Sequence, residues 1–313
     1  MSSCFRRARR AGGAGGIAAR AAGGGVAARA AAAVAPMLAC AAAAGLLFAF
    51  AAAARAEPLR VCADPNNLPY SDRSESGFEN ALAKLAASAL GYDGVAYTWL
   101  PQRRGFVRNS LNAHLCDVIM GVPVGYELAA TTKPYYYSTY VFVTRTRDRL
   151  ALTGFDDAAL ERLRIGVPAV GDDYSMTPGE IALEHRGIVR NVVGYSILGD
   201  YSKPHPPSRL IEAVAAGDID VAIAWGPIAG YFAARQNVPL TVTPVPPGSD
   251  APSIPFVYGM AMAVRRDDPS LRDRLNAFIS ARTRDIEQVL ERYSIPVVAP
   301  CAAEGKDSQE KGS

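Results

Sequence analysis

Apolar and polar positions follow two different periods along this chain, and each change of period marks an expected element. Short apolar or alternating runs predict strands at residues 59–64, 94–99, 117–121, 163–167, 189–195, 220–225 and 256–264. Helical spacing between them predicts helices at residues 77–90, 102–114, 177–187, 208–216, 228–236 and 271–292. Strands and helices therefore alternate, which is typical of parallel β-α-β units, and the sequence predicts an α/β protein.

Two stretches repeat the same order of a helix, a small residue, an aspartate and an apolar strand. They are LNAHLCDVIMG at residues 111–121 and IEAVAAGDIDVAIAWG at residues 211–226. This repeat of architecture predicts two similar α/β lobes. The Pro-, Gly- and Ser-rich residues 241–255 predict a loop, and the polar, aperiodic residues 302–313 predict a disordered tail.

The first 56 residues differ in composition from the rest. They carry seven arginines and no acid, an apolar run at residues 37–54 and the exit sequence Ala54-Arg55-Ala56. This pattern is typical of a cleaved signal peptide, so we expect residues 1–56 to direct export to the periplasm, with no membrane anchor after processing. Without these seven, 26 of the 33 basic residues remain against 30 acidic ones, a net charge of −4. That balance does not favour nucleic-acid binding.

Three cysteines remain after processing, and an oxidising compartment favours one disulfide among them. Sequence alone permits three pairings of Cys62, Cys116 and Cys301. We expect Cys62 and Cys116 to pair if their strands are neighbours, with Cys301, beside the polar tail, as the alternative partner.

Catalytic and metal-binding motifs are absent from the sequence. The histidines His114, His185 and His205 are isolated, and no nucleophile elbow, zinc motif, phosphate-binding loop or C-x-x-C occurs. The adjacent acids Asp172 and Asp173 are typical of a solvated turn or a helix cap. We therefore expect that the protein is not an enzyme and that it binds neither a metal nor a cofactor. The less favoured alternative is a dehydratase that acts through a cleft carboxylate, Asp64 or Glu127.

The stretch WLPQRRGFVRNSL carries three arginines just after an expected strand. Arg103 and Arg104 fall on the first turn of the helix expected at residues 102–114, where the helix dipole favours negative charge. Arg104 and Arg108 are four residues apart, a spacing at which like charges destabilise a helix. The arginines are suited to an anion or an acidic partner, and the alternative is internal pairing with acids such as Asp64, Glu79 or Glu127.

Several longer stretches resemble the periplasmic solute-binding proteins with a two-lobed, Venus-flytrap fold and two crossover hinge strands. In chain order they are LRVCADPNNLPY, GFENALAKLAASAL, CDVIMG, LRIGVPAVGDDYS and AGDIDVAIAWGPIAGYF. The stretches RVCADPNNLP, WLPQRRGFVRNSL, CDVIMGVPVGYE and TTKPYYYSTYVFV resemble one branch, the J-type accessory proteins MxaJ and XoxJ. These are encoded beside quinoprotein methanol dehydrogenases, and the resemblance does not separate the calcium from the lanthanide type.

The resemblance implies a division of the chain and a ligand cleft. Lobe one would comprise residues 57–142 and 256–301, and lobe two residues 143–255. The cleft lies at the carboxyl ends of the strands, which implies these cleft residues: Asp64, Asn66, Asn67, Tyr70, Arg103, Arg104, Gly121, Tyr126, Asp173 and Trp225. Asn66 and Asn67 are equally suited to holding a tight turn, and Trp225 is equally suited to the core.

Amino-acid carriers of this superfamily are a poor match. The turn GVPVGYELAATT lacks the hydroxyl pair and the arginine that hold a carboxylate, and Trp225-Gly226-Pro227 replaces the acid that holds the amino group. The resemblance instead implies a non-catalytic protein that assists a PQQ-dependent methanol or alcohol dehydrogenase, with its cytochrome as a further candidate partner. Its expected partner surface is Arg104, Arg108, Tyr135 and Tyr137, because alternation exposes the two tyrosines and buries Tyr136. The alternative function is an importer receptor for a small anionic ligand.

Overall fold

A computed structural model describes residues 57–169, 176–197, 201–246 and 254–299 of the 313-residue chain. The expected signal peptide, the expected tail at residues 302–313, Cys301 and the acids Asp172 and Asp173 lie outside these residues. Within them, no helix is both long and apolar enough to cross a bilayer.

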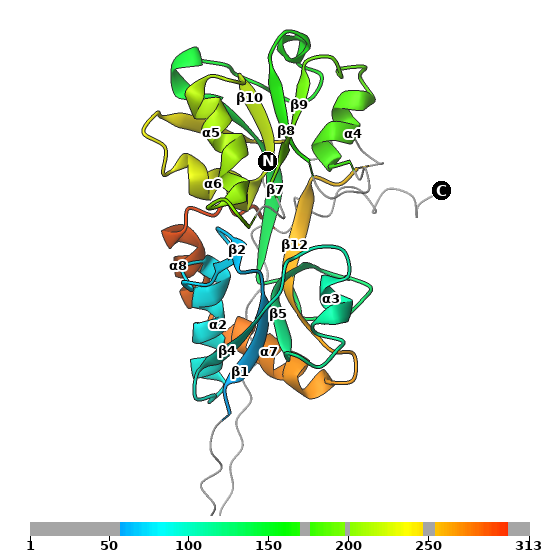
Figure 1. The fold of residues 1–313 in the computed structure, drawn as a ribbon, viewed down its shortest axis with the longest axis vertical. Coiled ribbons are helices and arrows are strands. Elements are labelled where there is room, and N and C mark those ends of the chain that lie inside the picture. Colours follow the sequence, from blue (N-terminus) through cyan, green and yellow to red (C-terminus); the bar gives the residue numbers. More distant parts are fainter. Residues whose placement is uncertain (1–56, 170–175, 198–200, 247–253, 300–313) are drawn as a thin grey trace, which may run out of the picture. The chain divides into compact units, whose positions relative to one another are not determined.

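Ten strands of the described part form one mixed sheet (Figure 1). Its order is β4 (Val95–Trp99), β1 (Leu59–Ala63), β5 (Val118–Pro123), β12 (Val257–Val264), β7 (Tyr136–Arg145), β10 (Val221–Trp225), β8 (Ile165–Ala169) and β9 (Val192–Ser196). β6 (Ala130–Thr131) pairs with β12, and β11 (Leu240–Pro244) pairs with β7. The pairs β1–β4, β1–β5, β8–β9 and β8–β10 are parallel, as the α/β prediction requires.

The strand β7 links the two lobes. Its first half pairs with β12 through residues 136–139, and its second half pairs with β10 and β11 through residues 140–145. At the change of partner, the Tyr140 N–H donates to Phe256 O at 3.1 Å, and Val245 N–H donates to Tyr140 O at 2.9 Å. Lobe one therefore contains β1, β4, β5, β6 and β12, and lobe two contains β8 to β11.

Helices cover the strands of each lobe (Figure 1). Lobe one has α2 (Phe78–Ala89), α3 (Phe106–Asn109), α7 (Pro269–Ala281) and α8 (Thr283–Arg292). Lobe two has α4 (Pro178–Glu184), α5 (Arg209–Ala216), α6 (Gly226–Ala233) and the 3₁₀ turns Thr146–Asp148, Ala158–Glu161 and Pro206–Ser208. Local sequence explains their starts: Thr177 and Glu180 form a capping box before α4, and the Asp268 carboxylate caps α7 by accepting from Leu271 N–H at 3.0 Å.

Three predicted elements differ from the structure. The helix expected at residues 102–114 is reduced to α3, because Gly105 adopts φ +86° and starts the helix only at Phe106. Arg103 and Arg104 therefore precede the helix and do not lie on its first turn. The long helix expected at residues 271–292 is broken at Arg282 (φ −117°, ψ 25°) into α7 and α8. The loop expected at residues 241–255 contains most of β11, whose alternating residues Leu240 to Pro244 add to the edge of β7.

Each lobe has its own buried core. In lobe one, α2, α7 and the strands bury a cluster that includes Leu59, Val61, Phe78, Leu82, Met262 and Leu275. In lobe two, two clusters form on the faces of the sheet, and they include Val143, Leu210, Ile211, Phe142, Phe155 and Ile165. Leu68, from the loop after β1, is buried in the core of lobe two, and Tyr70 and Tyr293 of lobe one pack against that core.

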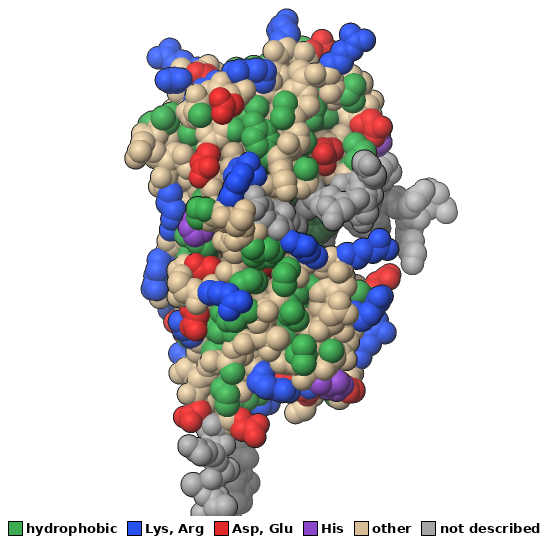
Figure 2. Space-filling model, viewed as in Figure 1, with side chains coloured by type: hydrophobic (Ala, Val, Ile, Leu, Met, Phe, Trp, Pro, Cys, Tyr) green, Lys and Arg blue, Asp and Glu red, His purple; other side chains and the backbone are tan. Residues whose placement is uncertain are grey.

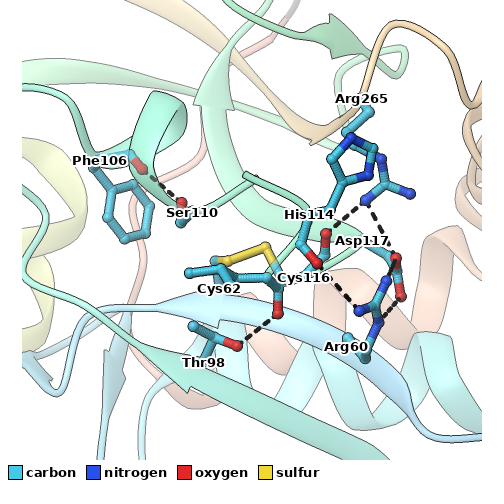
Figure 3. Close-up of a disulfide and its surroundings, with 10 residues drawn as sticks. Arg60, Cys62, Thr98, Phe106, Ser110, His114, Cys116, Asp117 and Arg265 are labelled. Atoms are coloured by element: carbon cyan, nitrogen blue, oxygen red, sulfur yellow. Dashed lines mark hydrogen bonds and ion pairs between the residues drawn. A yellow bond between two sulfur atoms is a disulfide. The ribbon is translucent and has the colours of Figure 1, made fainter. Parts of the chain in front are cut away.

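A disulfide joins β1 to the start of β5 (Figure 3). Cys62 and Cys116 are bonded, with their Cα atoms 5.5 Å apart, so the expected pairing is confirmed. Both are buried beside Val107, Leu111 and Ile119, in the cluster that supports α3.

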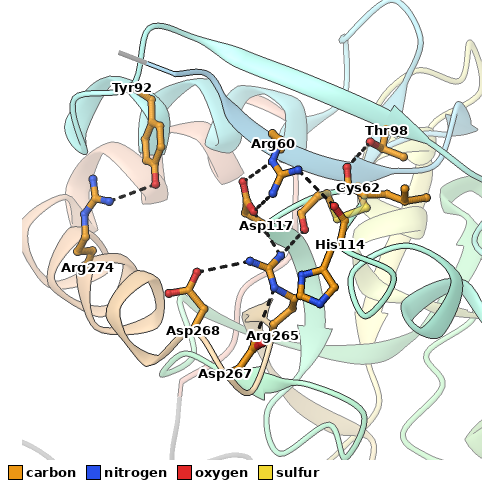
Figure 4. A network of polar contacts seen from close by, with 12 residues as sticks. Arg60, Cys62, Tyr92, Thr98, His114, Asp117, Arg265, Asp267, Asp268 and Arg274 are labelled. Carbon is orange, nitrogen blue, oxygen red and sulfur yellow. Dashed lines mark hydrogen bonds and ion pairs between the residues drawn. A yellow bond between two sulfur atoms is a disulfide. The ribbon is translucent and has the colours of Figure 1, made fainter. Parts of the chain in front are cut away.

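An ion-pair network lies next to the disulfide (Figure 4). Arg60 binds both oxygens of Asp117, and Arg265 donates to Asp117 Oδ1 at 3.3 Å and to Cys116 O at 2.6 Å. Hydrogen bonding from Arg60 lowers the pKa of Asp117, against the effect of its partial burial. The network ties the ends of β1, β5 and β12 together at the edge of the lobe.

Candidate functional site

The carboxylate of Asp64 gathers three segments at the carboxyl end of β1. It is 3% exposed. It accepts hydrogen bonds from Asn66 N–H at 2.8 Å, from Gln102 N–H at 2.6 Å and from the Tyr201 hydroxyl at 2.7 Å. Because Tyr201 belongs to lobe two, Asp64 is a contact between the lobes. An acid with three donors is a structural anchor.

The two asparagines that follow serve the same contact. Asn66 donates from its side chain to Lys203 O at 2.9 Å and accepts from His205 N–H at 3.2 Å, both in lobe two. Asn67 donates to the Gln102 side chain at 2.9 Å. The polar side chains of the loop after β1 are thus hydrogen-bonded to other parts of the same chain. Leu68 of this loop adds an apolar contact to lobe two.

A carboxyl that the sequence did not single out as a cleft group lies among tyrosines behind this loop. Glu79, in the first turn of α2, packs directly against Gly121 of β5. Burial raises the pKa of Glu79 to about 8. Burial also raises the pKa of Tyr70, Tyr135 and Tyr136 well above the usual value, and the nearby Glu79 charge adds to each shift.

The tyrosine cluster corrects one expectation. Tyr136 is 3% exposed, as alternation predicts. Tyr135 is only partly exposed: its ring packs on the lobe-one core, and its hydroxyl donates to Met120 O at 2.9 Å. Tyr137 is partly exposed as well. The structure therefore does not present the pair as an open aromatic surface, because β7 is covered by β12 on this side and Pro134 and Gly259 flank Tyr137.

Trp225 lies where the two lobes meet. It ends β10, and its partly buried ring packs 5.4 Å from Tyr140 and 5.7 Å from Tyr258 between ring centroids. It also packs on the cores of both lobes. Trp225 and Tyr70 are thus aromatic linings of the region between the lobes, with partial exposure.

The arginine stretch forms the wall of a separate pocket in lobe one, which we call the arginine pocket. Its volume is about 650 Å³. It lies between the α3 segment and the end of β5, on a side of the lobe where basic side chains gather (Figure 2). Its lining is Gln102, Arg103, Arg104, Gly105, Phe106, Val107, Arg108, Asn109, Ile119, Gly121, Val122, Pro123, Tyr126 and Leu128.

Apart from Tyr70, Trp225 and Asp173, the predicted cleft residues fall into two groups. Asp64, Asn66 and Asn67 take part in contacts to lobe two or to Gln102, whereas Arg103, Arg104, Gly121 and Tyr126 line the arginine pocket with Arg108. Arg103 also lies over the ring of Tyr201, with its guanidinium carbon 5.6 Å from the centroid. Asp173 lies outside the described residues. Within the described part, no group of three or more potential ligands gathers as a metal site would require.

Sequence reasoning missed the contact of Tyr201 with Asp64 and the packing of Glu79 against Gly121. The signal for Glu79 was present, because an acid at the start of an amphipathic helix whose buried face carries Phe78 and Leu82 must lie near the core. Tyr201 gave no signal, since it lies in a polar segment of unassigned structure.

Comparison with known proteins places this fold. Residues 121–293 match the family described as bacterial extracellular solute-binding protein. The chain is 32% identical to protein MoxJ of Methylorubrum extorquens, over 80% of this chain and 85% of MoxJ. The chain belongs to the bacterial extracellular solute-binding proteins and, among them, to the MoxJ group.

Two solved structures support the same assignment. The periplasmic binding protein XoxJ of Methylobacterium extorquens is 34% identical, with a TM-score of 0.63 over 77% of this chain and 99% of XoxJ. MxaJ of Methlophaga aminisulfidivorans is 26% identical, with a TM-score of 0.64 over 77% of this chain and 100% of MxaJ. The two-lobed periplasmic-binding-protein fold predicted from the sequence is confirmed.

Proposed function

We propose that this protein is a non-catalytic periplasmic accessory protein that binds a PQQ-dependent methanol or alcohol dehydrogenase and assists its maturation or activation. The observation that carries the proposal is the kinship with MoxJ, over 80% of this chain, and with XoxJ, over 77% of it. The signal-peptide pattern of residues 1–56 agrees with the compartment.

The polar groups of the loop after β1 also favour a protein partner over an amino-acid ligand. Asp64 and Asn66 are engaged by lobe two. No arginine clamp follows β5, where the turn of Pro123 to Tyr126 is apolar apart from its tyrosine hydroxyl. A zwitterion would find neither of its usual partners there.

We propose Arg104, Arg108 and Tyr137 as the partner surface. Both arginines are exposed, and an acidic patch on the dehydrogenase would be steered to them by long-range attraction. Tyr135 is a poorer contact than the sequence suggested, because its hydroxyl is held by Met120 O.

Native mass spectrometry of the protein drawn gently from its own periplasm tests the proposal. We expect a complex whose added mass is that of a quinoprotein dehydrogenase. The charge-reversed variant Arg104→Glu/Arg108→Glu should weaken that complex, and Arg190→Glu/Arg284→Glu, which alters two exposed arginines elsewhere, should not. A small added mass of a few hundred daltons without the dehydrogenase would overturn the accessory role in favour of a solute receptor.

A strain without this gene gives the second readout. We expect its dehydrogenase to accumulate with low specific activity, and a plasmid copy to restore it. Full activity in the deletion strain would contradict a role in maturation or activation, even if the complex exists.

A further inference from the structure

Arg104 and Arg108 line the arginine pocket without an acid to balance them. Arg104 lies in the turn before α3 and Arg108 within it, and both are exposed. Within the described part of the chain, no carboxylate lies within ion-pair distance of either side chain. In the network beside the disulfide, by contrast, Arg60 and Arg265 both pair with Asp117. The pocket therefore holds uncompensated positive charge.

The other residues that line the pocket indicate which properties, besides negative charge, a ligand would need. None of the described residues that line the pocket is acidic. Val107, Ile119 and Val122 are buried apolar wall, and Leu128 is 42% exposed at the same pocket. Guanidinium groups beside an apolar wall suit a molecule with several carboxylates on an apolar body. The volume of about 650 Å³ lies within the usual range for small-molecule sites.

We propose that the arginine pocket binds a small polycarboxylate with a flat apolar body, such as an aromatic di- or tricarboxylate. The carboxylates would be held by Arg104 and Arg108, and the ring would lie on Val122 and Leu128. This site lies within lobe one, so it does not require the lobes to close. It also does not rest on the dehydrogenase, because the isolated protein contains all of these residues.

The same lining disfavours a zwitterion and a compact inorganic anion. An ammonium group would find no carboxylate in the pocket and would face the arginines. Sulfate would satisfy the charge but leave the apolar wall in contact with water. The chemical class is therefore defined by two requirements that can be tested separately.

Isothermal titration of the processed protein with benzene-1,3,5-tricarboxylate and with pyridine-2,6-dicarboxylate is the test. We expect saturable one-to-one binding that weakens with added salt, at least tenfold tighter than sulfate or L-phenylalanine. Arg104→Ala and Arg108→Ala should each weaken it by roughly tenfold, since a charge-assisted hydrogen bond is typically worth that much. Arg284→Ala is the matched control and should leave it unchanged. Arg104→Lys should retain part of the affinity, which separates loss of charge from loss of fold.

The proposal is overturned if neither polycarboxylate binds, if sulfate binds as tightly as the tricarboxylate, or if both alanine variants bind like the parent while melting at the same temperature. Leu128→Asp, which places a negative charge on the exposed part of the apolar wall, gives an independent check and should abolish binding without lowering the melting temperature. The titration uses the isolated protein and does not need the dehydrogenase complex. The tricarboxylate can therefore bind or fail to bind whether or not the complex forms, so the two proposals fail separately.

Discussion

The carboxyl of Glu79 packs against the backbone of Gly121, so that a Cβ at position 121 would occupy the space of Glu79 Oε1. This contact joins the first turn of α2 to the middle of β5. It explains why position 121 within that strand is glycine, although its backbone conformation does not require one.

Burial of Glu79 predicts a pH dependence of stability. Its pKa is raised from 4.5 to about 8 in the folded protein, so between these values the folded state holds a proton that the unfolded state has lost. The contribution of Glu79 to the free energy of unfolding is therefore complete below about pH 4.5. It declines as the pH rises toward 8, by at most about 1.4 kcal/mol per pH unit. Urea denaturation from pH 5 to 9 should show a flatter profile for Glu79→Gln. A profile identical to that of the parent would rule the effect out.

Replacing Gly121 tests the same contact from the other side. Gly121→Ala must push the Glu79 side chain away, and we expect the free energy of unfolding to fall by about 1–3 kcal/mol. The double variant Gly121→Ala/Glu79→Ala should recover most of this loss, because the space for the new methyl group is then available. Gly125→Ala is not a suitable control, since Gly125 has φ +77°. Gly194→Ala in β9 is the matched control and should change the stability little, because a Cβ there would lie 3.4 Å from Ala169 Cβ, an ordinary contact.

The contact between Asp64 and Tyr201 predicts how the lobes are held. Tyr201→Phe removes one donor and should cost about 1 kcal/mol. Asp64→Ala leaves the N–H groups of Asn66 and Gln102 without their acceptor and should cost about 3 kcal/mol. Small-angle scattering should show a larger radius of gyration for both variants if the contact holds the lobes together. Tyr92→Phe, which removes a hydroxyl bound by Arg274 on the surface, should change neither quantity.

Removing the disulfide should lower the free energy of unfolding more than the substitutions above. Cys62 and Cys116 are separated by 54 positions in sequence, and closing a loop of that length removes unfolded-state entropy equivalent to about 4 kcal/mol. The variant Cys62→Ala/Cys116→Ala should therefore unfold at a markedly lower urea concentration. Equal midpoints for the variant and the parent would mean that the bond does not constrain the unfolded chain. Cys301→Ser is the control for a thiol outside this pair.

The fold was largely predictable because most elements are amphipathic helices or buried apolar strands. In such elements the spacing of the apolar residues indicates which side is buried. The structure has the elements expected at residues 59–64, 77–90 and 220–225 within a residue or two. The late start of the helix expected at residues 102–114 was not predictable, because it is set by the left-handed backbone of Gly105. β11 was missed because Pro-rich flanks obscured five alternating residues.

The candidate site was predictable only as a set of positions. The arginines and Tyr126 were expected near one crevice, and they do line one pocket. Their relation to Asp64 was not predictable, because Asp64 is taken up by Gln102 and Tyr201, a residue 137 positions further along the chain. Such long-range competition for a hydrogen-bond partner leaves no local pattern in the sequence.

Because one strand supplies backbone hydrogen bonds to both lobes, the two halves of this protein are coupled in their unfolding. If residues 136–139 of β7 separate from β12, the strand is freed at one end, and its other half, residues 140–145, is the part that pairs with β10 and β11. Loss of either half therefore removes support from the other, and we expect the two lobes to unfold in a single transition. Mutations in lobe one should then lower the measured stability of lobe two by the same amount, so neither lobe has a separate melting temperature.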